Sequence, residues 1–271
     1  MTSTRRNVPK LLWLPAALAA LFFALPLVGL ALRAPWRELL QLLSGTAVFD
    51  ALILSLWSSL LATLLSLLLG LPLAAWLAST RSVAAVLVRV LVTLPMVLPP
   101  VVGGVALLLV YGRGGFVGSW TESWFGAALP FTSAGVVAAA TYVAMPFFVL
   151  TVEGGLRGLD PRPADAAATL GARPLRVFVT VTLPMLLPSL RAGLLVAWAR
   201  ALGEFGATIT FAGNLAGTTR TMPLAVHVAL EDSPDKAMAL SVVLVLISAG
   251  VLFVLRRQWF PTLRRDAEVR S

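Results

Sequence analysis

The sequence predicts an all-α polytopic membrane protein with six transmembrane helices, and three observations carry this prediction. Hydrophobic residues make up 59% of the 271 residues and charged residues 12%, whereas soluble domains are about 45–50% apolar and about 25% charged. The apolar residues gather in runs near or above the ~18 residues that a membrane span requires. The 21 lysines and arginines fall unevenly between these runs, as they do around membrane helices. A soluble globular domain and a disordered chain are both excluded.

Six segments are expected to cross the membrane as one transmembrane domain that covers residues 1–271. The first follows three basic residues, as a signal peptide does, but its apolar run of about 22 residues exceeds the roughly 7–15 of a signal core. We therefore expect it to be retained. The second is long enough to tilt or to extend beyond the bilayer. The segments are residues 11–32, 51–78, 86–111, 133–151, 192–212 and 238–255.

The basic residues predict the orientation. If the amino terminus lies in the cytoplasm and each segment crosses once, fourteen basic residues lie inside and five outside, which places both termini in the cytoplasm. The other two, Arg191 and Arg200, lie at the inner edge of the fifth segment and within it. The inner set is Arg5, Arg6, Lys10, Arg81, Arg89, Arg157, Arg162, Arg173, Arg176, Arg256, Arg257, Arg264, Arg265 and Arg270. The outer set is Arg33, Arg37, Arg113, Arg220 and Lys236. The net charge of +9 is thus explained by topology, and nucleic acid is not an expected partner.

The third segment is interrupted by helix breakers. Pro95, Pro99 and Pro100 each remove a helix hydrogen bond and clash with a preceding carbonyl, and Gly103 and Gly104 follow them. Broken backbone is tolerated in a bilayer only inside protein or beside a water-filled cavity. Pro99 and Pro100 are therefore candidates for lining a pathway, as in transporters with discontinuous helices; a purely structural kink is the alternative.

The fifth segment carries two charges. Arg200 and Glu204 are four residues apart, so on one continuous helix they share a face and can pair, and Thr208 continues that face. Ionisable groups inside a membrane span are costly and commonly functional. We expect a polar lining or gate, with a structural ion pair as the alternative.

The segment between the fourth and fifth spans predicts a compact helical elbow over residues 160–184 on the cytoplasmic side. Asp160 can cap a helix that begins at Pro161, and Gly171 can end it. A second helix is expected to start at Pro174. The first helix is rich in alanine, which makes it small, flat and stable, so it could dock into a groove of another protein.

Several chemistries are absent from the sequence. There is no cysteine and only one histidine, and the two lysines, Lys10 and Lys236, do not belong to a phosphate-binding GxxxxGK[ST] motif. The chain is therefore not expected to be an enzyme or to hold a metal. Energy for active transport would come from a partner protein or from an ion gradient.

The elbow resembles the coupling motif of ABC importer permeases. That family pattern is Glu-Ala-Ala, three residues, Gly, nine residues, Ile, one residue, Leu-Pro. Here Asp165-Ala166-Ala167 is followed by Gly171 and then by Val181-Thr182-Leu183-Pro184 at the same spacing. Aspartate replaces glutamate and valine replaces isoleucine.

A narrower resemblance, to the molybdate permease subunits of these importers, covers the chain from about residue 49 to 255. It lies in the run 94–104, in 199–214, which includes Gly203-Glu204-Phe205-Gly206-Ala207, and in 219–225. The sulfate and thiosulfate permeases share parts of these motifs.

The resemblance implies the type I ABC importer permease fold and a set of partners in the cytoplasmic membrane. Two copies of the chain would form the pathway, and an extracytoplasmic binding protein would deliver molybdate or tungstate. A cytoplasmic ATPase dimer would bind ATP and magnesium, none of which this chain would hold itself, and would receive the elbow. The coupling residues would be Asp165, Ala166, Ala167, Gly171, Leu183 and Pro184. The alternatives are a sulfate or thiosulfate permease, or an ion-gradient transporter that acts alone.

Overall fold

The computed structural model describes residues 9–126 and 128–255. Within these residues every regular element is a helix. The predicted charges Arg5, Arg6, Arg256, Arg257, Arg264, Arg265 and Arg270 lie outside the described residues. The all-α membrane architecture is confirmed, because five helices are long and apolar enough to cross a bilayer and a bent pair of helices makes a sixth candidate.

The long helices follow four of the six predicted spans. They are α1 (Trp13–Arg33), α3 (Thr46–Ser79), α7 (Ser133–Arg157) and α13 (Pro234–Leu255). Shorter elements lie between and beside the spans: η1 (Lys10–Leu12), α2 (Leu39–Leu43), α6 (Phe116–Phe125) and α12 (Met222–Asp232). At 34 residues, α3 is about 51 Å long at the helical rise of 1.5 Å per residue, so it is longer than the hydrocarbon layer is thick, as expected from its sequence.

The predicted third span, residues 86–111, is not one straight helix. It consists of α4 (Val83–Val97) and α5 (Pro100–Tyr111), which are bent by 120° at the intervening break. With 15 and 12 residues, the two helices are about 22 Å and 18 Å long, so neither alone spans a hydrocarbon core of about 30 Å.

The predicted fifth span, residues 192–212, is wrong at both ends. A continuous helix begins at Pro174 and ends at Leu202; it comprises α9 (Pro174–Val177), a π-helical segment η2 (Phe178–Thr182) and α10 (Leu183–Leu202). The second helix of the elbow is therefore the start of this span. Pro184 has no N–H for the carbonyl of Thr180, which explains why the wider helix forms here.

The core of the bundle is built around α7. It packs on one side against α3 and on the other against α10, and Phe148 on α7 is fully buried between them. A Cβ on Gly70 of α3 would lie 2.8 Å from the Phe148 ring, and one on Gly193 of α10 would lie 3.3 Å from it. Small residues thus let the three helices approach closely, as is common where apolar helices pack in lipid.

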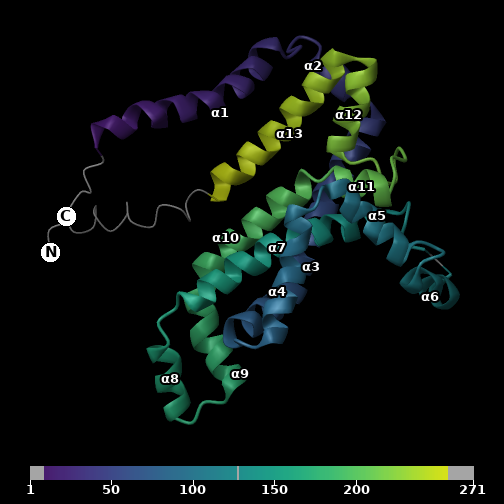
Figure 1. Ribbon diagram of the computed structural model, residues 1–271. Coiled ribbons are helices and arrows are strands. Elements are labelled where there is room, and N and C mark those ends of the chain that lie inside the picture. Colours follow the sequence, from purple (N-terminus) through teal and green to yellow (C-terminus); the bar gives the residue numbers. More distant parts are fainter. Residues whose placement is uncertain (1–8, 127, 256–271) are drawn as a thin grey trace.

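Figure 1 shows how the elements are arranged along this bundle. The elbow, α8 (Arg162–Thr169) with α9, lies at its lower end, and α2 and α12 lie at the upper end. Helix α1 runs apart from the bundle, and none of its residues is buried.

The close approach at Gly70 predicts a stability effect. In the variant Gly70→Val the new side chain has to displace Phe148, and overpacking of this kind costs about 1–3 kcal/mol. We expect a lower melting temperature of the purified protein, followed by tryptophan fluorescence in detergent. The matched control is Gly29→Val on α1, where an added Cβ meets no atom within 4 Å. Equal melting temperatures for the two variants would contradict this packing.

Candidate functional site

The first candidate site is the break between α4 and α5, where the sequence placed Pro99 and Pro100. Both residues are exposed, and Pro99 precedes the first residue of α5. Because neither has an N–H, the carbonyls of Pro95 and Met96 lose the donors that a continuous helix would provide. Such backbone groups do not face hydrocarbon. In the membrane this surface must therefore meet another protein segment or water.

A second break follows α10. The helix ends at Leu202, and a short helix, α11 (Gly206–Phe211), begins after three residues. The expectation that Arg200, Glu204 and Thr208 share one continuous helix face is therefore wrong, because Gly203 to Phe205 separate the two helices. Arg200 lies in the last turn of α10, Glu204 lies in the break, and Thr208 is buried within α11.

The predicted pair of Arg200 and Glu204 is present despite the break. Arg200 Nη1 lies 3.2 Å from Glu204 Oε2, and the Glu204 residue is only 2% exposed. The other carboxylate oxygen, Oε1, accepts a hydrogen bond of 2.8 Å from the backbone N–H of Ala207. Glu204 thus caps the first turn of α11 and places negative charge at the positive end of that helix.

Arg200 is held on a second side by an aromatic ring. Its guanidinium carbon lies 6.0 Å from the centroid of Phe147 on α7, within the range of a cation–π contact. The arginine side chain remains 30% exposed. Glu204 Oε2 has no hydrogen bond of good geometry, so the guanidinium holds this oxygen by charge.

The two breaks lie side by side. A Cβ on Gly206 of α11 would lie 2.8 Å from Cβ of Pro100, and a Cβ on Gly104 of α5 would lie 2.7 Å from Cβ of Thr210. Glycine is therefore required at both positions for α5 and α11 to pack. The structure brings Pro99–Pro100 and Arg200–Glu204 into one region, which the sequence had presented as two unrelated features.

The second candidate site is the elbow. Asp160 Oδ1 accepts a hydrogen bond of 3.1 Å from the N–H of Arg162, at the start of α8, and Gly171 ends the turn with φ of +84°. This left-handed conformation favours glycine. The capping residues predicted for the elbow are thus confirmed, with the helix itself beginning at Arg162.

The predicted coupling residues divide between the surface and the base of the elbow. Asp165, Ala166 and Gly171 are exposed and Ala167 is half-buried. Leu183, which is half-buried, and Pro184, which is exposed, follow η2 at the start of α10. They are therefore positioned to support the elbow, where α8 packs against η2.

The sequence interpretation placed two leucines in the elbow helices but did not single them out as exposed contact residues. Leu170 is 89% exposed and Leu175 is 75% exposed, and they flank the Gly171 turn. Large apolar side chains at such exposure on a tight turn are typical of anchors that enter a pocket of a partner. Their position beside the predicted glycine cap was the signal that could have found them.

A charged cluster near the elbow was also missed. Glu153 on α7 is 4% exposed; its Oε1 lies 2.6 Å from Arg89 Nη2 on α4 and 3.0 Å from Arg157 Nη2 on α7. We call these three residues the Glu153 cluster. Because Arg89 and Glu153 lie within or at the end of apolar segments, the cost of burying charge could have singled them out.

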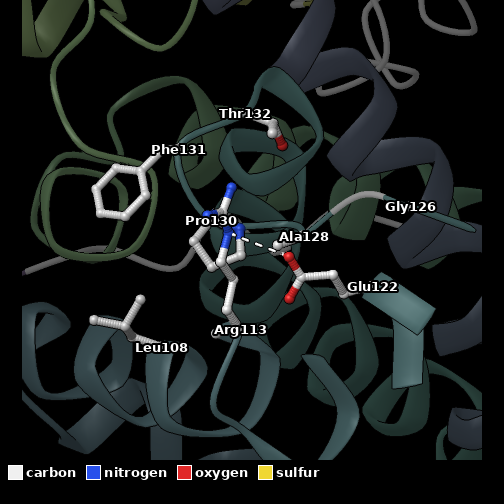
Figure 2. Close-up of a pocket in the computed structure, with 9 residues that line it drawn as sticks. Leu108, Arg113, Glu122, Gly126, Ala128, Pro130, Phe131 and Thr132 are labelled. Atoms are coloured by element: carbon white, nitrogen blue, oxygen red, sulfur yellow. Dashed lines mark ion pairs between the residues drawn. The ribbon is translucent and has the colours of Figure 1, made fainter. Parts of the chain in front are cut away.

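A surface cavity of 630 Å³ lies near the end of α7 that is opposite the elbow (Figure 2). Arg113 and Glu122 face each other across it, with 3.6 Å between Nε and Oε1. None of the predicted site residues lines this cavity. Its lining residues are Leu108, Gly112, Arg113, Glu122, Gly126, Ala128, Pro130, Phe131 and Thr132.

Comparison with solved structures identifies the fold. The bacterial ABC transporter that imports the acidic polysaccharide alginate matches with a TM-score of 0.74 and 18% identity, over 93% of this chain and 94% of that chain. The MetNI methionine ABC transporter matches with a TM-score of 0.57 and 20% identity, over 79% and 96% of the two chains. The fold is therefore that of ABC importer permeases of type I.

The family follows from the sequence itself. Residues 67–262 match the model of the binding-protein-dependent transport system inner membrane component, and the chain belongs to this family. It is 44% identical to the molybdenum transport system permease protein ModB of Mycobacterium tuberculosis, over 91% of this chain and 93% of that protein. It is 39% identical to ModB of Escherichia coli, over 62% and 73% of the two chains, and 36% identical to the sulfate transport system permease protein CysW of Synechocystis, over 58% and 56%.

The Arg200–Glu204 pair predicts that removal of the arginine charge impairs insertion and transport. Arg200→Leu leaves the buried Glu204 carboxylate without its counter-charge, and breaking a buried pair in this way costs about 3–5 kcal/mol. We expect less inserted protein and less uptake per cell, measured by quantitative immunoblotting and transport assay. The control is Arg113→Leu, which removes an arginine from an exposed pair worth at most about 1 kcal/mol. Normal abundance and uptake of Arg200→Leu would show that the pair is not required.

Proposed function

We propose that this chain is the permease subunit of an ATP-driven importer that carries molybdate, and also tungstate, across the cytoplasmic membrane. The observation that carries this proposal is the 44% identity to a molybdenum transport system permease over 91% of the chain. The type I importer fold agrees with it, as does the match of residues 67–262 to the inner membrane components of binding-protein-dependent systems.

Two copies of the chain would enclose the pathway. The exposed break at Pro99–Pro100 needs cover that lipid does not provide, and a second copy facing it would supply protein on one side and a water-filled path between the two. Arg200 then offers a positive group near a molybdate anion, while Glu204 keeps its charge partly balanced. The extracytoplasmic binding protein would deliver the anion at the end opposite the elbow.

The elbow would lie in the cytoplasm, with both chain termini on the same side. Arg81, Arg162, Arg173 and Arg176 lie in or next to the turns at this end of the bundle, in agreement with the excess of basic residues on the cytoplasmic side of membrane proteins. The exposed face of α8, with Leu170 and Leu175 beside it, would enter a groove of a separate ATPase dimer. That dimer would bind ATP and magnesium and supply the energy.

A sulfate or thiosulfate permease is the second candidate. It is favoured by the 36% identity to a sulfate transport permease, although this match covers 58% of the chain. The residues around Gly203-Glu204-Phe205-Gly206 do not by themselves decide between tetrahedral oxyanions, because an arginine recognises their shared negative charge and oxygen donors. The binding protein that stimulates transport therefore decides the substrate.

The proposal is tested by reconstitution. The permease is placed in proteoliposomes with its ATPase, and ATP hydrolysis and uptake of labelled molybdate are measured with molybdate-binding or sulfate-binding protein outside. We expect stimulation by the loaded molybdate-binding protein only. Stimulation by the sulfate-binding protein alone would favour the second candidate. ATP-independent uptake by the permease alone would support an ion-gradient transporter and contradict the proposal.

The elbow makes a separate prediction in the same assay. Gly171→Asp puts a β-carbon at a residue with positive φ, and Ala167→Glu adds a charged side chain to the packed side of α8. We expect the permease to remain inserted while stimulated hydrolysis and uptake fall more than about tenfold, a loss of roughly 1.4 kcal/mol of coupling. A matched control is Gly126→Asp, which also has positive φ and open space around its Cβ but lies far from the elbow in the chain. Full coupling in both elbow variants would exclude α8 as the docking helix.

A further inference from the structure

The Glu153 cluster joins three helices at one point. Arg89 Nε donates to both oxygens of Glu153, at 3.0 Å and 3.3 Å. Arg89 Nη2 and Arg157 Nη2 also donate to the backbone carbonyl of Leu77, at 3.3 Å and 3.1 Å. Leu77 lies in the last turn of α3, where carbonyls lack partners within the helix and cations are favourable. Helices α3, α4 and α7 are thus tied together by hydrogen bonds to two guanidinium groups.

The cluster lies immediately before the elbow in the chain. Arg157 is the last residue of α7, and α8 begins five residues later, at Arg162. Two residues after Glu153, Gly155 packs against Ser189 of α10 with no room for a side chain. The end of α7 is therefore fixed to α3 and α4 on one side and to α10 on the other.

Arg89 provides the polar connection of α4. In the described part of the chain, the side-chain hydrogen bonds that join α4 to other helices all come from Arg89. Arg89 is eight residues before Val97, the last residue of α4, which corresponds to about 12 Å along the helix. The Pro99–Pro100 break lies directly after the end of α4. Helix α4 therefore connects the Glu153 cluster, which it meets near its middle, with the broken backbone at its carboxyl end.

We propose that Glu153 is a positioning residue that transmits movement of the elbow to the broken α4–α5 span. The carboxylate keeps Arg89 and Arg157 together, so that the end of α7 and helix α4 move as one body when the ATPase displaces α8. Through α4 this movement reaches Pro99–Pro100, and through the contact of Pro100 with Gly206 it reaches the Arg200–Glu204 pair. This inference rests on the proposed function.

The test separates transmission from simple support of the fold. A residue that only supports the fold changes the amount of intact protein, whereas a transmitting residue changes the uptake obtained per ATP hydrolysed. In the reconstituted importer, Glu153→Gln keeps the size of the side chain and removes its charge. We expect molybdate uptake per ATP to fall at least about fivefold, the lower end of coupling between protein sites, with basal hydrolysis retained. Glu153→Asp keeps the charge and is expected to restore part of the ratio.

Two further variants complete the experiment. Glu122→Gln makes the same change in the exposed pair with Arg113 and is expected to leave the ratio unchanged. If Glu153→Gln does not insert into the membrane, the variant Arg157→Gln is tested in its place. Arg157 is half-exposed, and its replacement leaves the Arg89–Glu153 pair intact. We expect a smaller fall in molybdate uptake per ATP. An unchanged ratio in the inserted variant overturns the inference, even if protein yield falls. Absence of ATP-driven molybdate uptake in the wild type overturns the proposed function instead.

Discussion

Backbone groups without hydrogen-bond partners cannot face hydrocarbon, yet this chain breaks two helices within its apolar segments. The prolines at 99 and 100 end α4, and Gly203 ends α10. The structure meets part of the constraint by packing the broken parts together: Gly104 and Gly206 let α5 and α11 approach until backbone and side chains are in van der Waals contact, while Pro99 and Pro100 remain exposed. Glu204 then satisfies the first turn of α11 with its carboxylate. The charged pair and the glycines follow from this one requirement.

The arrangement of the long helices connects these breaks with the elbow. Helix α7 lies at the centre, with Phe148 enclosed by α3 and α10, and its last turn carries the buried Glu153. Close packing of this kind transmits displacement because it leaves no voids to absorb it. A movement at α8 therefore has a direct route to the interrupted spans. Under the proposed function, this route would carry movement that a partner ATPase imposes on the elbow to the interrupted spans.

Local sequence predicted much of this structure. The positions of proline and glycine predicted the interruption of the third span, and the capping residues Asp160 and Gly171 predicted the elbow helix. The end of the fifth span could not be placed, because the apolar pattern continues from 192 to 212 while the helix ends at Leu202. Glu204 then caps α11 from a non-helical position. Contacts between distant segments could not be predicted either. Arg89 and Glu153 are 64 residues apart, and the local sequence around each residue does not indicate the other as its partner.

The most direct test of this account is the environment of the Pro99–Pro100 break in the assembled importer. The chain has no cysteine, so single cysteines can be placed without further changes at Val101 beside the break and at Leu18 on α1, which are 50% and 59% exposed in the isolated chain. A water-soluble, membrane-impermeant thiol reagent should modify Val101→Cys in either the nucleotide-free or the ATP-bound state and leave Leu18→Cys unmodified. If Val101→Cys is as unreactive as Leu18→Cys in both states, the break faces lipid or dry protein and does not line a pathway.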